Sequence, residues 1–265
     1  MKNFKYLIFI FLTVVLAVKA DLYLERNSQM DEVVILEKVY SKGPFYKETN
    51  PNNSLSVNWE TDHIIYENHR HRIFWEGTAE EFQTAMQQMI KESEEHSLVG
   101  YSDEEREAAE EQLKKYKANP QKMSFSVKAS GKSEKLLGYD CQEFIVLNDT
   151  TPIAAFYHSP KINLIEKPYL EKAKALFKKL NYNDPTDFLQ SSAMESYMFS
   201  GLIIKMVIYG DYTSSEEVEE YVNVQQEDID PTIFGVTDGY SLMPLIEVMK
   251  LDLFEDEVDT DETNE

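Results

Sequence analysis

The clearest indication of the fold is in residues 33–75, VVILEKVYSKGPFYKETNPNNSLSVNWETDHIIYENHRHRIFW. Short runs rich in β-branched and aromatic residues alternate in it with turn residues at Gly43-Pro44, at 50–53 and at Glu67-Asn68. These turns delimit strands expected at 33–40, 45–49, 55–59, 64–66 and 72–75, preceded by one at 22–25. Strands joined by turns of a few residues run antiparallel, because parallel crossovers need about a dozen residues. The stretch therefore predicts an antiparallel meander.

The pattern becomes helical after the meander. Thr78 followed by Glu81 is a capping box, and apolar residues then recur at spacings of three and four, at Phe82, Met86, Met89 and Ile90. Further helices are expected from Ser102 to Asn119-Pro120, from Pro168, and from Asp184 to about Met198. Strand patterns return at 122–157, 202–209 and 219–226. We expect a single α+β domain over residues 21–251.

The first twenty residues have the features of a secretory signal peptide. Lys2 and Lys5 precede an apolar run from Tyr6 to Val18, and small residues follow at the positions a signal peptidase reads. That run is shorter than the roughly 20 residues that a membrane-spanning helix needs. We therefore expect cleavage between Ala20 and Asp21 and no transmembrane span in the mature chain. The expected location is the periplasm of a Gram-negative bacterium, with secretion as the alternative.

Acidic side chains dominate the charge. The 265 residues include 48 acidic and 26 basic ones, for a formal net charge of −22. This charge argues against a nucleic-acid partner, because binding a polyanion needs a surplus of lysine and arginine. Residues 252–265 hold eight acidic residues and no basic one, which predicts a disordered acidic tail. One helix face could contact an anionic membrane or partner through its lysines, Lys172, Lys174, Lys178 and Lys179, but such a face is more often simply solvated.

The single cysteine, Cys141, cannot form an internal disulfide, so the stability of an exported chain has to come from its core. Cys141 lies in the expected strand 139–146. Free cysteines are among the most buried residues, and the neighbouring acids Asp140 and Glu143 would oppose formation of a reactive thiolate. We expect an inert, buried thiol.

The best candidate metal ligands are His63, Glu67, His69 and His71. On an uninterrupted strand, Glu67, His69 and His71 would project from one face and could share zinc with a fourth ligand. A turn at 67–70 would separate the two histidines, which makes an exposed loop the more ordinary interpretation. No nucleophile elbow, phosphate loop or dinucleotide fingerprint occurs. We therefore expect no catalytic, metal or cofactor-binding residue and no enzymatic activity.

Three segments resemble an uncharacterised family of exported bacterial proteins, a DUF4412-like domain of unknown function. They are Gly138–Phe144, Gly201–Met206, and Ile229–Phe234 continued by Asp238–Tyr240. Thr237-Asp238 and Phe156-Tyr157 depart from the family's usual proline and tryptophan. The resemblance implies a fold similar to the lipoprotein carriers LolA and LolB. This would be a strongly curved antiparallel sheet, an incomplete β-barrel, with helices on its concave side.

These features favour a non-enzymatic binding protein whose apolar cavity accepts a hydrophobic small molecule, a lipid or the acyl chain of a lipoprotein. The supply of 14 Phe, 16 Tyr and 10 Met residues suits such a cavity but would equally fill a core. The first alternative is an envelope structural or interaction protein that acts through its acidic surface or tail. The second alternative is a metal-dependent hydrolase built on the four candidate ligands. The sequence does not indicate the oligomeric state.

Overall fold

The computed structural model describes residues 21–30, 33–96, 123–180, 187–210 and 216–254. Within them, twelve strands form one open sheet in the order β12-β6-β5-β4-β3-β2-β1-β11-β10-β9-β8-β7. The strands of the first half are β1 (Asp21–Met30), β2 (Val33–Lys42), β3 (Phe45–Thr49), β4 (Asn53–Asn58), β5 (His63–Asn68) and β6 (Ile73–Thr78). Those of the second half are β7 (Phe125–Leu136), β8 (Tyr139–Asn148), β9 (Thr151–Ser159), β10 (Leu202–Ile208), β11 (Glu217–Glu227) and β12 (Ser241–Leu242).

The predicted meander is confirmed, because β1 to β6 follow one another as antiparallel neighbours. Turn chemistry sets their register. Gly43 adopts a left-handed conformation, with φ of 56°, between β2 and β3, a conformation that glycine tolerates well. The side chain of Asn50 accepts hydrogen bonds from the backbone N–H groups of Asn52 and Asn53, both at 2.9 Å, before β4. Among the described strands, only β12 departs from antiparallel pairing, because it lies parallel to β6.

The helices of the described chain are α1 (Ala79–His96), α3 (Leu170–Leu180), α4 (Ser192–Met198) and α5 (Leu245–Phe254), with short 3₁₀ turns η1 (Lys167–Tyr169), η2 (Phe188–Gln190) and η3 (Pro231–Phe234). The predicted capping box of α1 is present, since the Thr78 N–H donates to the Glu81 carboxylate at 2.7 Å. The helix predicted from Asp184 is instead η2 followed by α4, because Ser191 between them is extended. The helix predicted from Ser102 lies outside the described residues.

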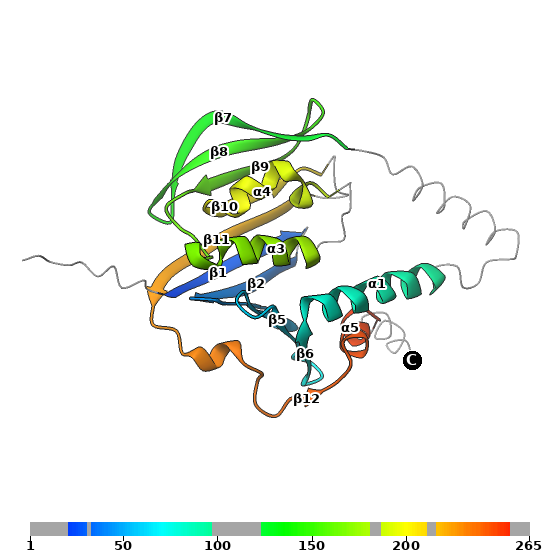
Figure 1. Cartoon of the computed structure of the whole chain (residues 1–265). Helices are drawn as coiled ribbons and strands as arrows, with labels where there is room; N and C mark the ends of the chain where they lie inside the picture. The colour runs from blue at the N-terminus through cyan, green and yellow to red at the C-terminus, as the bar shows by residue number, and fades with distance from the viewer. Residues whose placement is uncertain (1–20, 31–32, 97–122, 181–186, 211–215, 255–265) are drawn as a thin grey trace, which may run out of the picture.

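Two faces of the sheet can be distinguished by what covers them. Val57 and Ile64 pack with Ala173 and Leu176 of α3, and further along the sheet Phe156 packs with Met194 of α4. We call this helix-covered side the inner face, and the sheet curves around it (Figure 1). Side chains alternate between faces along a strand. The neighbours of Val57 and Ile64 in the strands therefore point to the opposite, outer face.

A C-terminal strap, residues 228–244, covers part of the outer face. It leaves β11, forms η3 against β3, and reaches the edge of the sheet as β12 (Figure 1). Phe234 of the strap stacks on Phe45 of β3, with 5.4 Å between ring centroids. After the strap, α5 packs Leu245 and Met249 against Met89 of α1. The sequence did not predict β12 or α5, and α5 extends to Phe254, three residues into the predicted tail.

No described helix combines the length and the apolar character needed to cross a membrane.

Candidate functional site

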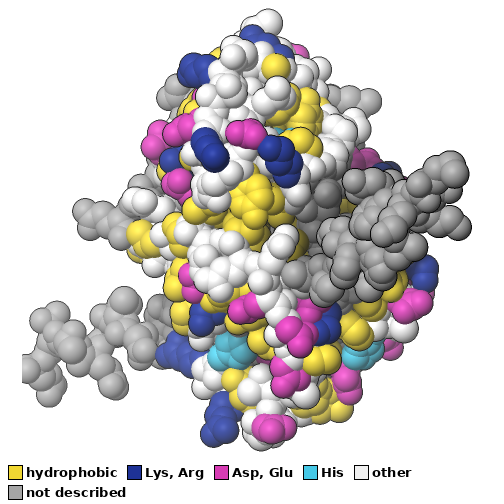
Figure 2. Space-filling model, turned by 90° about the vertical axis from the view of Figure 1, so that its left-hand side faces the viewer, with side chains coloured by type: hydrophobic (Ala, Val, Ile, Leu, Met, Phe, Trp, Pro, Cys, Tyr) yellow, Lys and Arg dark blue, Asp and Glu magenta, His cyan; other side chains and the backbone are white. Residues whose placement is uncertain are grey.

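The inner face holds a hollow of about 850 Å³ near the start of β1 and the end of β2. Its apolar lining comes from the sheet, from the chain between β9 and α3, and from the residues after α4: Leu22, Pro160, Leu164, Ile165, Pro168, Leu170 and Phe199. Polar and charged residues complete the wall: Asp21, Ser41, Asn163, Glu166, Lys167 and Ser200. Figure 2 views the molecule from the end where β1 begins and shows hydrophobic side chains gathered across the middle of that face.

The segment that leaves β9, residues 160–166, is fixed to the sheet and forms one side of this hollow. The hydroxyl group of Ser41 donates a hydrogen bond to the carbonyl oxygen of Leu164. Ile162 is buried in a cluster with Leu24 and Val39. The segment is therefore attached to β1 and β2 at two points, and five of its residues line the hollow: Pro160, Asn163, Leu164, Ile165 and Glu166.

A second hollow of about 260 Å³ adjoins the first, because Leu164 lines both. Its walls come from β1, β10, β11, η2 and α4, and its apolar lining includes Leu189, Met198, Leu202, Ile203 and Met206. Methionine side chains adapt to irregular apolar shapes because they are unbranched and flexible. The two hollows together form a largely apolar space between the sheet and its helices.

One wall of the second hollow is charged. The Arg26 guanidinium is bonded to Glu37, with 2.7 Å between Nε and the carboxylate, and to Glu48, and it lies 3.6 Å from Glu219. It also lies over the ring of Tyr221, at 5.9 Å from the centroid. The pKa of Glu37 is raised, because the effect of burial exceeds the opposing effect of the Arg26 charge. Three carboxylates around one guanidinium leave this wall acidic.

Sequence patterns did not indicate this charged cluster. Arg26, Glu37 and Glu48 occupy inner-face positions that alternate with outward ones, and they become neighbours only through the pairing of β1 with β2 and of β2 with β3. The first strand is predicted only at 22–25, with no turn assigned between residues 26 and 32, so no register could be derived that would place Arg26 opposite Glu37.

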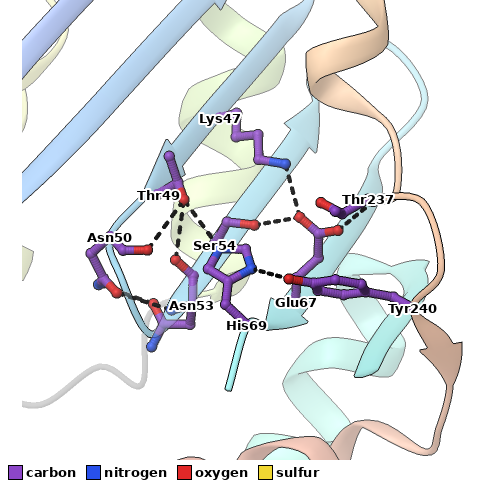
Figure 3. A network of polar contacts seen from close by, with 9 residues as sticks. All are labelled: Lys47, Thr49, Asn50, Asn53, Ser54, Glu67, His69, Thr237 and Tyr240. Carbon is purple, nitrogen blue, oxygen red and sulfur yellow. Dashed lines mark hydrogen bonds and ion pairs between the residues drawn. The ribbon is translucent and has the colours of Figure 1, made fainter. Parts of the chain in front are cut away.

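The outer face carries a buried polar network under the strap (Figure 3). Glu67 is completely buried and accepts hydrogen bonds from the Lys47 ammonium at 2.8 Å, from the Ser54 hydroxyl at 2.6 Å and from the Thr237 backbone N–H at 2.6 Å. Burial opposes ionisation of Glu67, but these three hydrogen bonds outweigh it and lower its pKa. A buried charge that is paired and fully hydrogen-bonded is tolerated in an interior. The network fastens the strap to the sheet and offers no reactive group.

The candidate metal ligands are not brought together. β5 ends at Asn68, so His69 and His71 lie in the turn to β6, as the turn interpretation expects. The His69 ring contacts the Tyr240 hydroxyl at 3.0 Å and the Thr49 hydroxyl at 3.2 Å, and His63 lies 3.5 Å from Glu76. No three His, Cys, Asp or Glu side chains in the described part of the chain are grouped so that they could hold a metal ion.

The predicted buried cysteine is confirmed. Cys141 is 1% exposed in β8, and burial raises the pKa of its thiol. The lysines of α3 mostly face acidic groups of the same chain: Lys174 is paired with Glu171, Lys178 with Glu195 and Lys179 with Asp62.

Comparisons with known proteins assign no family. No protein-family model matches the sequence, and no curated protein matches it. Similar solved structures include PNGF-II (TM-score 0.39, 8% identity, 88% of this chain and 32% of that chain). A second is an uncharacterised conserved protein from Thermus thermophilus (TM-score 0.43, 5% identity, 85% of this chain and 91% of that chain). A third is a DUF1329 family protein from Desulfovibrio piger (TM-score 0.29, 10% identity, 82% of this chain and 90% of that chain).

The chain spans about a third of the length of PNGF-II. At TM-scores below 0.5, these likenesses assign neither a family nor an activity. Some of the similar structures are themselves uncharacterised or belong to a family of unknown function. The DUF4412-like and LolA-like relationships stay predictions.

Proposed function

We propose that the chain is a non-enzymatic binding protein that holds an apolar group, such as an acyl chain, in the two adjoining hollows on its inner face. The observation that carries this proposal is the larger hollow, whose volume of about 850 Å³ lies within the roughly 300–1,000 Å³ of ligand pockets. Apolar side chains supply half of its fourteen lining residues, and six polar or charged residues supply groups that could orient a ligand. Transfer of an alkyl chain from water into this space is favourable by about 0.8 kcal/mol per buried CH₂.

The same proposal includes the finer points of the fold and location. An open antiparallel sheet with helices on one face is compatible with a LolA-like carrier, and a signal peptide cleaved between Ala20 and Asp21 would deliver the chain to the periplasm, where lipoprotein acyl chains are found. The metal-dependent hydrolase gains no support from the described residues, because its candidate ligands do not converge. Interaction through the acidic tail stays a prediction, since residues 255–265 lie outside the described residues.

The test uses a fluorescent fatty acid, dansylaminoundecanoic acid, titrated into the purified chain. Leu164 lines both hollows, so Leu164→Trp should fill the space between them and weaken binding about tenfold or more. Leu242→Trp introduces the same side chain at an exposed position in β12 and should leave binding unchanged. A wild-type chain that binds no probe, or a Leu164→Trp chain that binds it as tightly as the wild type, would refute the proposal.

A further inference from the structure

The hairpin of β1 and β2 has one edge that no described strand covers. β2 pairs with β1 from Val33 to Ser41, but it pairs with β3 only from Lys38 to Lys42. On the β3 side, residues 33–37 therefore have no strand beside them in the described part of the chain. This free edge is separate from the hollows of the proposed function.

Four apolar residues occupy the free edge and are exposed: Val33 at 61%, Val34 at 54%, Ile35 at 38% and Leu36 at 42%. Because side chains alternate between faces, both faces of this piece of sheet carry exposed apolar groups. Edge strands are normally protected by charged residues, prolines or bulges, since an exposed apolar edge is a template for another strand. Residues 33–36 contain none of these, and the one charged residue of the free edge, Glu37, is already bonded to Arg26 of the same chain.

The direction of the backbone groups can be worked out from the turn after β2. In an antiparallel ladder, the N–H and C=O of one residue point to the same side, and successive residues alternate. Lys42 and Phe45 face each other across the two-residue turn and so exchange hydrogen bonds. The backbone groups of Lys42 therefore point to the β3 side of β2, and so do those of every second residue before it. Val34 and Leu36 are among these residues, so their N–H and C=O groups point to the free edge.

We propose that this free edge pairs with the same edge of a second copy of the chain. The strands would run antiparallel about a two-fold axis at Ile35, with Val34 of each copy opposite Leu36 of the other. Both pairs would exchange two backbone hydrogen bonds, so four would form. Exposed apolar side chains of the two copies would meet on each face of the extended sheet. A two-fold contact of this kind is self-complementary and closed.

The length of the free edge favours a second copy as its occupant. In this register, Val33 of the second copy lies opposite Glu37 of the first. The residue after Glu37 in the first copy, Lys38, is already paired with Thr49 of its own β3. A strand placed on the edge must therefore end there. β2 begins at Val33, so the strand of the second copy ends just before Thr49, the last residue of β3.

The size and charge of the contact set its strength. Four exposed apolar residues per copy make a much smaller contact than the roughly 20–30 residues a side of a stable interface. Each copy also carries a formal net charge of −22, so the copies repel one another at low ionic strength. The dimer is therefore weak and concentration-dependent, and added salt strengthens it because ions screen the repulsion.

Sedimentation equilibrium up to about 1 mM chain, at 0.15 M and 0.5 M NaCl, tests the contact. Val34→Pro removes an N–H that faces the free edge and leaves the ladder with β1 intact, so it should raise the dissociation constant about tenfold or more. Far-UV circular dichroism checks that the variant stays folded. A wild type that is monomeric at every concentration, or a folded Val34→Pro chain that dimerises like the wild type, overturns the proposal.

The register has its own test at 0.15 M NaCl. Ile35→Glu and Ile35→Lys each place like charges opposite each other at the axis and should be monomeric alone, whereas an equimolar mixture should form a heterodimer. Val222→Glu and Val222→Lys, at an exposed position in β11, are matched controls that should dimerise like the wild type. Ile35 variants that dimerise alone, a mixture that remains monomeric, or loss of dimer in the Val222 variants would each refute this contact.

Discussion

Glu67 is the residue on which the attachment of the strap depends. Its carboxylate joins three parts of the chain, through Lys47 of β3, Ser54 of β4 and the backbone of Thr237. A buried ion pair adds little stability compared with an apolar pair of the same shape, but removing one partner leaves the other charge buried and uncompensated. The effect of a substitution here therefore depends on which partner is left behind.

Replacement of Glu67 by alanine should lower the free energy of unfolding by about 3–5 kcal/mol, because it leaves the Lys47 ammonium buried without a counter-ion. Urea unfolding at pH 7 measures the change. Glu60→Ala, at an exposed position, should change the free energy by less than about 0.5 kcal/mol. A loss below about 1 kcal/mol for Glu67→Ala would mean that Lys47 finds another partner or reaches water.

The lowered pKa of Glu67 makes its contribution depend on pH. Because this pKa is lower in the folded than in the unfolded chain, the stabilisation is complete above the unfolded value of about 4.3. It is lost as pH falls through the folded pKa. The gap in unfolding free energy between the wild type and Glu67→Gln should stay constant from about pH 6 to 8 and narrow below about pH 4. A gap that widens in acid would contradict the assignment.

Cys141 should be unreactive in the folded chain, because its thiol is buried and burial raises its pKa. Ellman's reagent at pH 8 should label it only after denaturant is added, and at the rate of unfolding. The mutant Val127→Cys, on the half-buried face of β7, supplies a more accessible thiol for comparison. Labelling of the native wild type at the rate of a free thiol would show that β8 opens readily.

At the scale of elements, the strap is the part that seals the outer face. Phe234 is 6% exposed and stacks on Phe45, so Phe234→Ala should lower the free energy of unfolding by about 3 kcal/mol. Brief proteolysis should then cut first within residues 228–244. Ile233→Ala, one residue earlier and only half-buried, should lower the free energy of unfolding by less than half as much. Equal decreases for the two variants would show that the Phe234 ring does not anchor the strap.

Local signals predicted the elements that depend on neighbouring residues. Gly43-Pro44 and Asn50 define hairpins through their own conformations and side chains, and Thr78 with Glu81 begins α1. The strap could not be predicted in this way, because its contacts with Glu67 and Phe45 join residues that are more than 160 positions apart. The hollows likewise could not be predicted, because their linings combine residues from β1, β2, segment 160–166 and the end of α4, which are far apart in the sequence.

At the scale of the whole molecule, the formal net charge of −22 destabilises the folded chain through repulsion. Raising NaCl from 0.01 M to 0.15 M shortens the screening length from about 30 Å to about 8 Å, so the melting temperature at pH 7 should rise. The measurement needs a dilute sample so that only monomer is present. Near the sequence pI of about 4.6, the same increase in NaCl should change the melting temperature much less, because the net charge is close to zero. A melting temperature that falls with salt at pH 7 would show that specific ion pairs outweigh the net repulsion.

The position of the first strand has a consequence for how the chain folds. β1 lies at the middle of the sheet and pairs Asp21 with Glu227 and Met30 with Glu217, so strands from opposite ends of the sequence form the central seam. Hairpins on either side can assemble from local contacts, but joining the halves requires closure of a loop of almost two hundred residues, and such distant pairings form slowly. The two halves of the sheet therefore stay apart until β11 is available to pair with β1.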